Sequence, residues 1–140
     1  MVEQLANERI QRFLAGKQVV VLATVQPDGA PLAMPMWFLL GGDRLTMVTI
    51  AGTQKVQNLR RDPRCCVVAE TGTRADIRGV TVQGRAEFVP DWADRRSLVE
   101  RLLERYSPEL EHRWGGHTMP ADRVLFHIVP HEVRSWGLPA

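Results

Sequence analysis

The chain has 140 residues, of which 44% are hydrophobic and 24% charged, so we expect one ordered domain spanning 1–140 rather than two domains or a disordered chain. Its 18 basic and 16 acidic residues leave a net charge of +2, which argues against a dedicated nucleic-acid or membrane-surface protein because such proteins usually carry a clear basic patch. The longest apolar run, around 31–40, is too short to span a membrane, and the N-terminus lacks a signal-peptide pattern, so the sequence predicts a soluble cytoplasmic protein.

The N-terminal third predicts a helix followed by a hairpin. Residues 3–14 form an amphipathic pattern that Gly16 ends, as expected of a helix C-terminus. Residues 19–25 are an unbroken apolar run, typical of a strand buried on both sides. The next four residues, Gln-Pro-Asp-Gly at 26–29, are a hairpin-turn signature.

The return strand, predicted over 30–40, is apolar on both faces. One face carries Leu32, Met34, Met36, Phe38 and Leu40, and the other carries Ala33, Pro35, Trp37 and Leu39. If one face lines the core, the other must meet a ligand or a second subunit. Pro31 and Pro35 cannot donate to a β-ladder, so we expect an irregular or edge strand.

The rest of the chain predicts four more strands, two further helices and a short helical turn. Strands are expected over 44–50, 64–69, 76–89 and 123–135, with a helix that Thr53 caps and that runs to about Arg61. Asp91 and Asp94 suggest a capped helix over 92–106, and a short helical turn follows Pro108. Six strands in hairpin order with two principal helices indicate a mainly β protein, an antiparallel barrel with helices packed outside.

The common catalytic and metal-binding motifs are absent from the sequence. Cys65 and Cys66 are adjacent, so their side chains point to opposite faces of a strand and are poorly placed to bond each other. His127 and His131 lie too far apart along a strand to share a metal. We therefore expect no metal, and we interpret the cysteines as small hydrophobic residues in a reducing compartment.

The best-defined constellation runs from Thr49 to Leu59 and describes a strand, a small-residue bend and the first turn of a helix that bears Lys55. The free N–H groups of a first helical turn attract an anion. Hydroxyls of Thr49 and Thr53 and the charge of Lys55 would suit a phosphate. A solvated lysine on a capped helix would explain the same spacing.

The segment Pro35-Met36-Trp37-Phe38 is the second candidate feature. Methionine and tryptophan form an apolar, polarisable wall against which a flat ring can pack. A dimer core is an equal alternative, and the two interpretations are compatible.

With these motifs the chain resembles the split-barrel flavin and deazaflavin oxidoreductases, the superfamily of the pyridoxamine 5'-phosphate oxidases and of enzymes that use coenzyme F420. The motifs that carry the resemblance are Leu22-Ala23-Thr24-Val25, Asp28-Gly29-x-Pro31, Pro35-x-Trp37-Phe38 and the run from Gly52 to Arg64 with its Lys-x-x-Asn-Leu-Arg-Arg-Asp-Pro core. The resemblance implies a six-stranded antiparallel split β-barrel of the FMN-binding, PNP oxidase-like type. It also implies a homodimer with two cofactor sites at its interface.

The resemblance also implies roles for individual residues. Lys55 and Thr53 would bind the cofactor phosphate, and Asn58 would support that pocket. The ring system would lie along Met34, Pro35, Met36 and Trp37, with Thr49 and Ile50 nearby. Trp136 would close the site from the other subunit.

The cofactor implied by the resemblance is coenzyme F420, with FMN as the alternative. Pyridoxamine 5'-phosphate oxidases carry an Arg-x-His type motif near the C-terminus, and residues 127–140 lack it. The short chain and its Pro-x-Trp-Phe strand look more like F420-dependent members. We therefore expect an enzyme that transfers a hydride from reduced F420 to a small organic electrophile. An FMN-dependent oxidoreductase and a non-catalytic cofactor-binding dimer are the alternatives.

Overall fold

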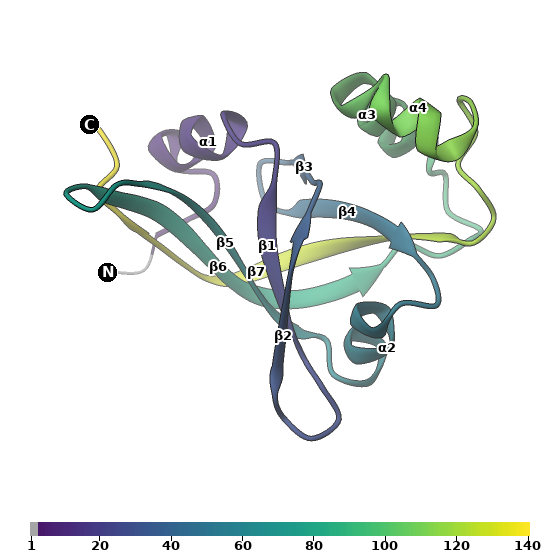
Figure 1. Ribbon diagram of the computed structural model, residues 1–140, viewed down its shortest axis with the longest axis horizontal. Coiled ribbons are helices and arrows are strands. Elements are labelled where there is room, and N and C mark those ends of the chain that lie inside the picture. The colour runs from purple at the N-terminus through teal and green to yellow at the C-terminus, as the bar shows by residue number, and fades with distance from the viewer. Residues whose placement is uncertain (1–2) are drawn as a thin grey trace.

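The structure is a computed structural model that describes residues 3–140 and contains one antiparallel sheet with the strand order β2-β1-β5-β6-β7-β4-β3 (Figure 1). The strands are β1 (Val20–Val25), β2 (Pro31–Met36), β3 (Leu39–Leu40), β4 (Leu45–Ile50), β5 (Arg64–Gly72), β6 (Ile77–Phe88) and β7 (Arg123–Trp136). The helices are α1 (Glu8–Ala15), α2 (Gln54–Arg61), α3 (Arg96–Tyr106) and α4 (Glu109–Trp114). The predicted mainly β, antiparallel architecture is confirmed.

The two edge strands of the sheet, β2 and β3, are neighbours in the chain. Only Trp37 and Phe38 separate them, so the two edges must come together at this point and the sheet curls into a half-barrel (Figure 1). The strand predicted over 30–40 is therefore two strands, and the prediction of six strands is wrong by one.

The break between β2 and β3 has a physical cause in the side chain of Tyr106. The backbone N–H of Phe38 donates to the Tyr106 hydroxyl at 2.9 Å, and that hydroxyl lies 2.9 Å from the Phe38 carbonyl and 2.8 Å from the Gln18 carbonyl. The backbone of Phe38 therefore bonds a helix residue rather than a neighbouring strand, and the ladder is interrupted there.

Helix α1 begins later than predicted because Asn7 caps it. The Asn7 side chain accepts hydrogen bonds from the backbone N–H groups of Arg9 and Ile10, which fixes the helix start at Glu8. Glu3 instead pairs with Val133 of β7. Gly16 ends the helix as predicted, and Ile10 is buried in the main core.

Strand β1 is buried on one face only, contrary to the prediction. Val20, Leu22 and Thr24 are buried, whereas the alternate residues are half-buried. Those alternate residues share an outer face with neighbouring apolar residues of β2 and β5, as the ladder register shows; the face comprises Val21, Ala23, Val25, Pro31, Ala33, Pro35, Cys66 and Val68.

Helices α3 and α4 lie together beside β4 in Figure 1 and form a second, smaller core. Tyr106, Leu102, Leu110, Leu39 and Leu125 are its buried members. The predicted helix start at 92 is wrong, because residues 91–95 form turns and the Asp94 carboxylate accepts from the Arg96 N–H at 3.0 Å. Helix α4, predicted as a short helical turn, ends at Gly115 in the left-handed conformation (φ 74°), which glycine adopts without strain.

Candidate functional site

Lys55 lies in the first turn of α2 and is buried, with 8% of its surface exposed. Val56 and Leu59 anchor the same helix in the protein interior. Among the described residues no hydrogen bond or ion pair reaches the Lys55 ammonium, and desolvation alone lowers the pKa of this group. A partly desolvated ammonium without a counter-charge costs stability unless a ligand supplies that charge.

A cavity of about 260 Å³ opens at Lys55 between the end of β4 and helix α4. Its described lining contains three cationic side chains, Lys55, Arg113 and Arg123, and no carboxylate. Arg123 pairs with the neighbouring Asp122, which leaves Lys55 and Arg113 without an acidic partner among residues 3–140. The positive lining makes this cavity suitable for an anion.

Thr53 precedes α2 but does not cap it with its side chain. Its hydroxyl donates to the Ile50 carbonyl at 2.9 Å, so it stabilises the bend between β4 and α2. The N–H groups of the first turn are therefore not occupied by the Thr53 side chain, and they add a positive dipole end beside Lys55.

A second cavity, of about 290 Å³, adjoins the first along a shared wall of Trp37, Val48, Thr49 and Arg113. Its remaining lining is apolar and comprises Val19, Pro35 and Met36. Each cavity is just below the range of roughly 300–1,000 Å³ that is usual for ligand sites. A ligand with a flat ring and a phosphate would therefore need both.

Residues of α3 and α4 hold the Trp37 ring in place. Its ring stacks on Tyr106, with 4.5 Å between centroids and 8° between planes, and the Arg113 guanidinium lies 5.1 Å from its centroid. Aromatic and cation–π contacts of this kind fix the ring orientation. Trp37 thus forms a rigid wall common to both cavities.

The structure brings together seven of the residues predicted for the site. Pro35, Met36, Trp37, Thr49, Ile50, Thr53 and Lys55 all line one or both of the two cavities. Their contact with a cofactor remains a prediction.

Three predicted residues lie outside both cavities. Met34 is exposed on β2, opposite Leu22. Asn58 is fully buried and joins α2 to β1, because its amide donates to the Thr24 hydroxyl at 3.0 Å. Trp136 ends β7 and packs over Gly79, so a role in closing the site depends on a second subunit.

The sequence alone did not point to Arg113 or Arg123, which line the cavity at Lys55 together with Trp114. Arg113 and Trp114 belong to a short helix whose position relative to β4 depends on the tertiary packing of α3 and α4. The sequence predicts the strand that begins at Arg123, but not the pairing of Arg123 with Ile50 that brings it to the site.

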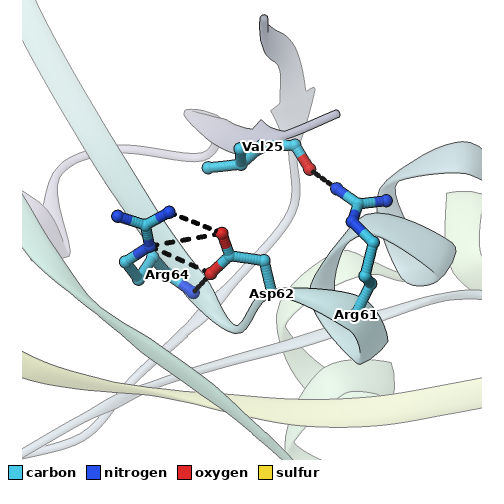
Figure 2. A network of polar contacts seen from close by, with 4 residues as sticks. All are labelled: Val25, Arg61, Asp62 and Arg64. Atoms are coloured by element: carbon cyan, nitrogen blue, oxygen red, sulfur yellow. Dashed lines mark hydrogen bonds and ion pairs between the residues drawn. The ribbon is translucent and has the colours of Figure 1, made fainter. Parts of the chain in front are cut away.

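The next arginines along the chain, two on α2 and one at the start of β5, serve the fold rather than the cavity. Figure 2 shows the Arg61 guanidinium on the Val25 carbonyl and the bidentate pair between Arg64 and Asp62. The side-chain hydrogen bond from Arg64 lowers the pKa of Asp62 to about 2. Arg60 lies 4.0 Å over the Phe88 ring. None of these arginines lines either cavity.

A larger cavity, of about 700 Å³, lies apart from this site, along α3 and the segment that follows α4. The arginines of its lining are paired within the chain, Arg95 with Asp91 and Arg96 with Asp94. It lacks a buried unpaired charge, and we consider the cavities at Trp37 the better candidate site.

Cysteine chemistry and metal binding find no support in the described residues. Cys65 is buried, and desolvation raises the pKa of its thiol to about 12. No group of three potential metal ligands occurs among residues 3–140. None of the helices in this range has the length and apolarity needed to cross a membrane.

The curled antiparallel sheet with its few helices is the fold of the PNP oxidase-like split-barrel class. The sequence profile of the family described as Pyridoxamine 5'-phosphate oxidase matches residues 6–137. The chain belongs to this family.

Solved structures share the fold. A conserved hypothetical protein from Mycobacterium tuberculosis is 32% identical, with 94% of this chain and 84% of that chain covered and a TM-score of 0.75. A candidate pyridoxamine 5'-phosphate oxidase from Listeria innocua is 27% identical, with 96% and 99% covered and a TM-score of 0.75. A FAD-binding protein from Mesorhizobium loti is 23% identical, with 96% of each chain covered and a TM-score of 0.74.

The fold by itself does not select one cofactor. A haem-binding protein from Mycobacterium smegmatis shares it at 22% identity, with 98% of this chain and 56% of that chain covered and a TM-score of 0.76. The choice of cofactor must therefore be argued from the residues that line the site.

Proposed function

We propose that this protein binds a phosphorylated flavin-type cofactor and transfers a hydride between it and a small organic electrophile. Reduced coenzyme F420 is the proposed donor, and FMN is the alternative cofactor. The observation that carries the proposal is the buried side chain of Lys55, whose ammonium lacks a partner among the described residues and opens on a cavity adjoining the Trp37 wall.

The residues present fit such a group. A phosphate at Lys55 would supply the missing counter-charge, with Arg123 and the first-turn N–H groups of α2 as further donors. The adjoining cavity is apolar apart from Thr49 and Arg113, which suits a flat ring system against Trp37 and Met36. A ligand with a phosphate at one end and a flat ring at the other therefore fits, with the phosphate in the cavity at Lys55 and the ring in the apolar cavity.

When bound, a flavin or deazaflavin supplies the hydride chemistry itself. The described lining of the two cavities contains no carboxylate and no histidine, so the chain contributes binding and orientation rather than an acid or base at the site. Lys55 holds the anionic end, and Trp37 fixes the plane of the ring. Helix α4, through Leu110 and Trp114, limits the access of water.

Two sequence features support F420 over FMN within this proposal. Residues 127–140 lack the Arg-x-His type motif of the B6-oxidising members, which weakens the case for the pyridoxamine 5'-phosphate oxidase reaction. The Pro35-x-Trp37-Phe38 segment is similar to that of F420-dependent members.

Absorption and fluorescence titration of the purified protein with F420, FMN and riboflavin tests the proposal. Binding of F420 that exceeds binding of FMN supports the leading assignment, and binding of FMN alone transfers it to the alternative. Failure to bind either phosphorylated cofactor refutes both. Bound reduced coenzyme that no enone, quinone or tetrapyrrole reoxidises would indicate a non-catalytic cofactor-binding protein.

We propose further that a second copy of the chain covers the outer face of β2, β1 and β5. This face is apolar, and its Ala33 and Pro35 are exposed in the single chain. The cavity that contains Pro35 opens beside it, so a second copy there would also enclose the ring end of the cofactor.

Sedimentation analysis of Ala33→Asp tests this arrangement. We expect the wild type to sediment as a dimer and Ala33→Asp as a monomer with weakened cofactor binding. Ile77→Asp is the control, because Ile77 is 64% exposed near the far end of the sheet. A monomeric wild type would refute the dimer.

A further inference from the structure

Arg113 is the one side chain with a full charge among the described residues that line the cavity at Pro35 and Met36. It also lines the cavity at Lys55. Its guanidinium thus lies where the proposed phosphate end and the proposed ring end of the site meet. Neither the fold nor the binding of a cofactor phosphate by Lys55 explains this charge.

The sequence offers Arg113 an obvious ion-pair partner that the structure does not use. Glu109 precedes it by one helical turn on α4, a spacing that favours a salt bridge. Among the ion pairs of residues 3–140, the acidic residue of α4 that is engaged is Glu111, which pairs with His117 at 3.4 Å. The Arg113 guanidinium lies instead over Trp37, 5.1 Å from the ring centroid.

A guanidinium in this position is prepared to bind an anion. Contact with the Trp37 face restrains it without using its N–H donors in a salt bridge. Its planar fork matches a carboxylate through two parallel hydrogen bonds. The apolar side chains of Pro35, Met36 and Val48 complete the cavity around it, which suits a ligand with an apolar body and one anionic group.

We infer that Arg113 determines substrate specificity at this site by binding an anionic group, a carboxylate in the first instance, of the electrophile that accepts the hydride. This inference rests on the proposed function for the identity of the ligand as an acceptor. An anionic group could also come from the cofactor, beyond the phosphate held at Lys55, and the experiment must separate these two sources.

The test compares benzoate with benzamide, which have the same apolar body and differ in charge. Binding is measured by quenching of tryptophan fluorescence in the cofactor-free protein and by perturbation of the flavin spectrum in the FMN-loaded protein. We expect the wild type to prefer benzoate by about 10-fold or more, which is the scale of a charge-assisted hydrogen bond. Arg113→Gln should abolish this preference, and Arg113→Lys should retain part of it.

Arg60→Gln is the matched control. Arg60 also lies over an aromatic ring, that of Phe88, but it lines neither cavity. We expect its benzoate preference to equal that of the wild type. A wild type without preference for benzoate, or a preference that Arg113→Gln leaves unchanged, would overturn the inference.

Titration of the same variants with F420, FMN and riboflavin separates the two sources of the anion. If Arg113 binds the acceptor, Arg113→Gln changes the affinity for all three by the same factor, because any loosening of Trp37 affects the shared ring system alike. If Arg113→Gln weakens F420 or FMN selectively against riboflavin, the anion belongs to the cofactor and the assignment to the acceptor is wrong. A benzoate preference that persists in the cofactor-free protein when neither F420 nor FMN binds would support the Arg113 site and refute the proposed function alone.

Discussion

Replacing Lys55 with methionine separates the binding of phosphate from the stability of the fold. Methionine keeps most of the apolar stem of the side chain and removes the ammonium. Lys55 is 8% exposed and its pKa is lowered by desolvation, with no partner among the described residues. In the cofactor-free protein this partly desolvated charge opposes folding, so we expect Lys55→Met to be at least as stable as the wild type.

Cofactor binding should change in the opposite direction. A hydrogen bond that involves a charged group contributes about 1.5–3 kcal/mol, which corresponds to a rise of about 10- to 150-fold in the Kd of FMN or F420. Riboflavin has the same ring system without the phosphate, so its Kd should not change. We therefore expect Lys55→Met to lose affinity only for the phosphorylated ligands.

Fluorescence titration with FMN and riboflavin measures the binding, and urea unfolding of the cofactor-free protein measures stability. Gln57→Met is a control on the same helix, because Gln57 is exposed and its side chain bonds the Gly52 carbonyl outside the cavity lining. An unchanged Kd for FMN in Lys55→Met would show that the lysine is merely solvated and would refute the phosphate site. A marked loss of stability would refute the claim that its charge is uncompensated.

Three further predictions concern the pH dependence and the fold. Because the pKa of the Lys55 ammonium is lowered, this group should lose its proton at a lower pH than an exposed lysine does. As the pH rises through that range, the affinity for phosphate should fall and the stability of the cofactor-free protein should rise. Titrations against pH should show neither change in Lys55→Met. Tyr106→Phe leaves the Phe38 N–H without its 2.9 Å partner and should lower the free energy of unfolding in urea by about 1–3 kcal/mol. Gly84→Ala would place a Cβ 2.3 Å from the Val129 carbonyl oxygen and should lower the melting temperature, whereas Gly42→Ala, with open space around it, should not; equal melting temperatures would contradict the argument from close packing.

The order of most elements could be predicted because local signals are strong. The turn at 26–29 forms as expected, with Gly29 at φ 89° and the Gln26 N–H bonded to the Ala30 carbonyl. The strand predicted over 76–89 also forms, as β6, with Val80, Val82 and Ala86 buried on one face. Each of these features depends on residues close in sequence, where turn and strand preferences act directly.

The errors fall where distant contacts override local pattern. The apolar run from Pro31 to Leu40 satisfies the strand pattern throughout, and it is interrupted only because Tyr106, from a distant helix, bonds the Phe38 backbone. The position of Arg113 against Trp37 depends on the same packing of α3 and α4. Sequence periodicity carries no information about contacts between distant residues. The sequence therefore predicted Lys55 as part of the site but not Arg113.

The two residues that join the sheet edges have divided duties, since Phe38 belongs to the main core and Trp37 to the small one under α3 and α4. Mutations of Trp37 therefore risk separating the two sheet edges that meet between β2 and β3. Helix α4 also lines the candidate site, but none of its residues belongs to the segment that joins β2 to β3. Selection could thus retune ligand preference through a few exposed positions of this helix while leaving the β scaffold untouched.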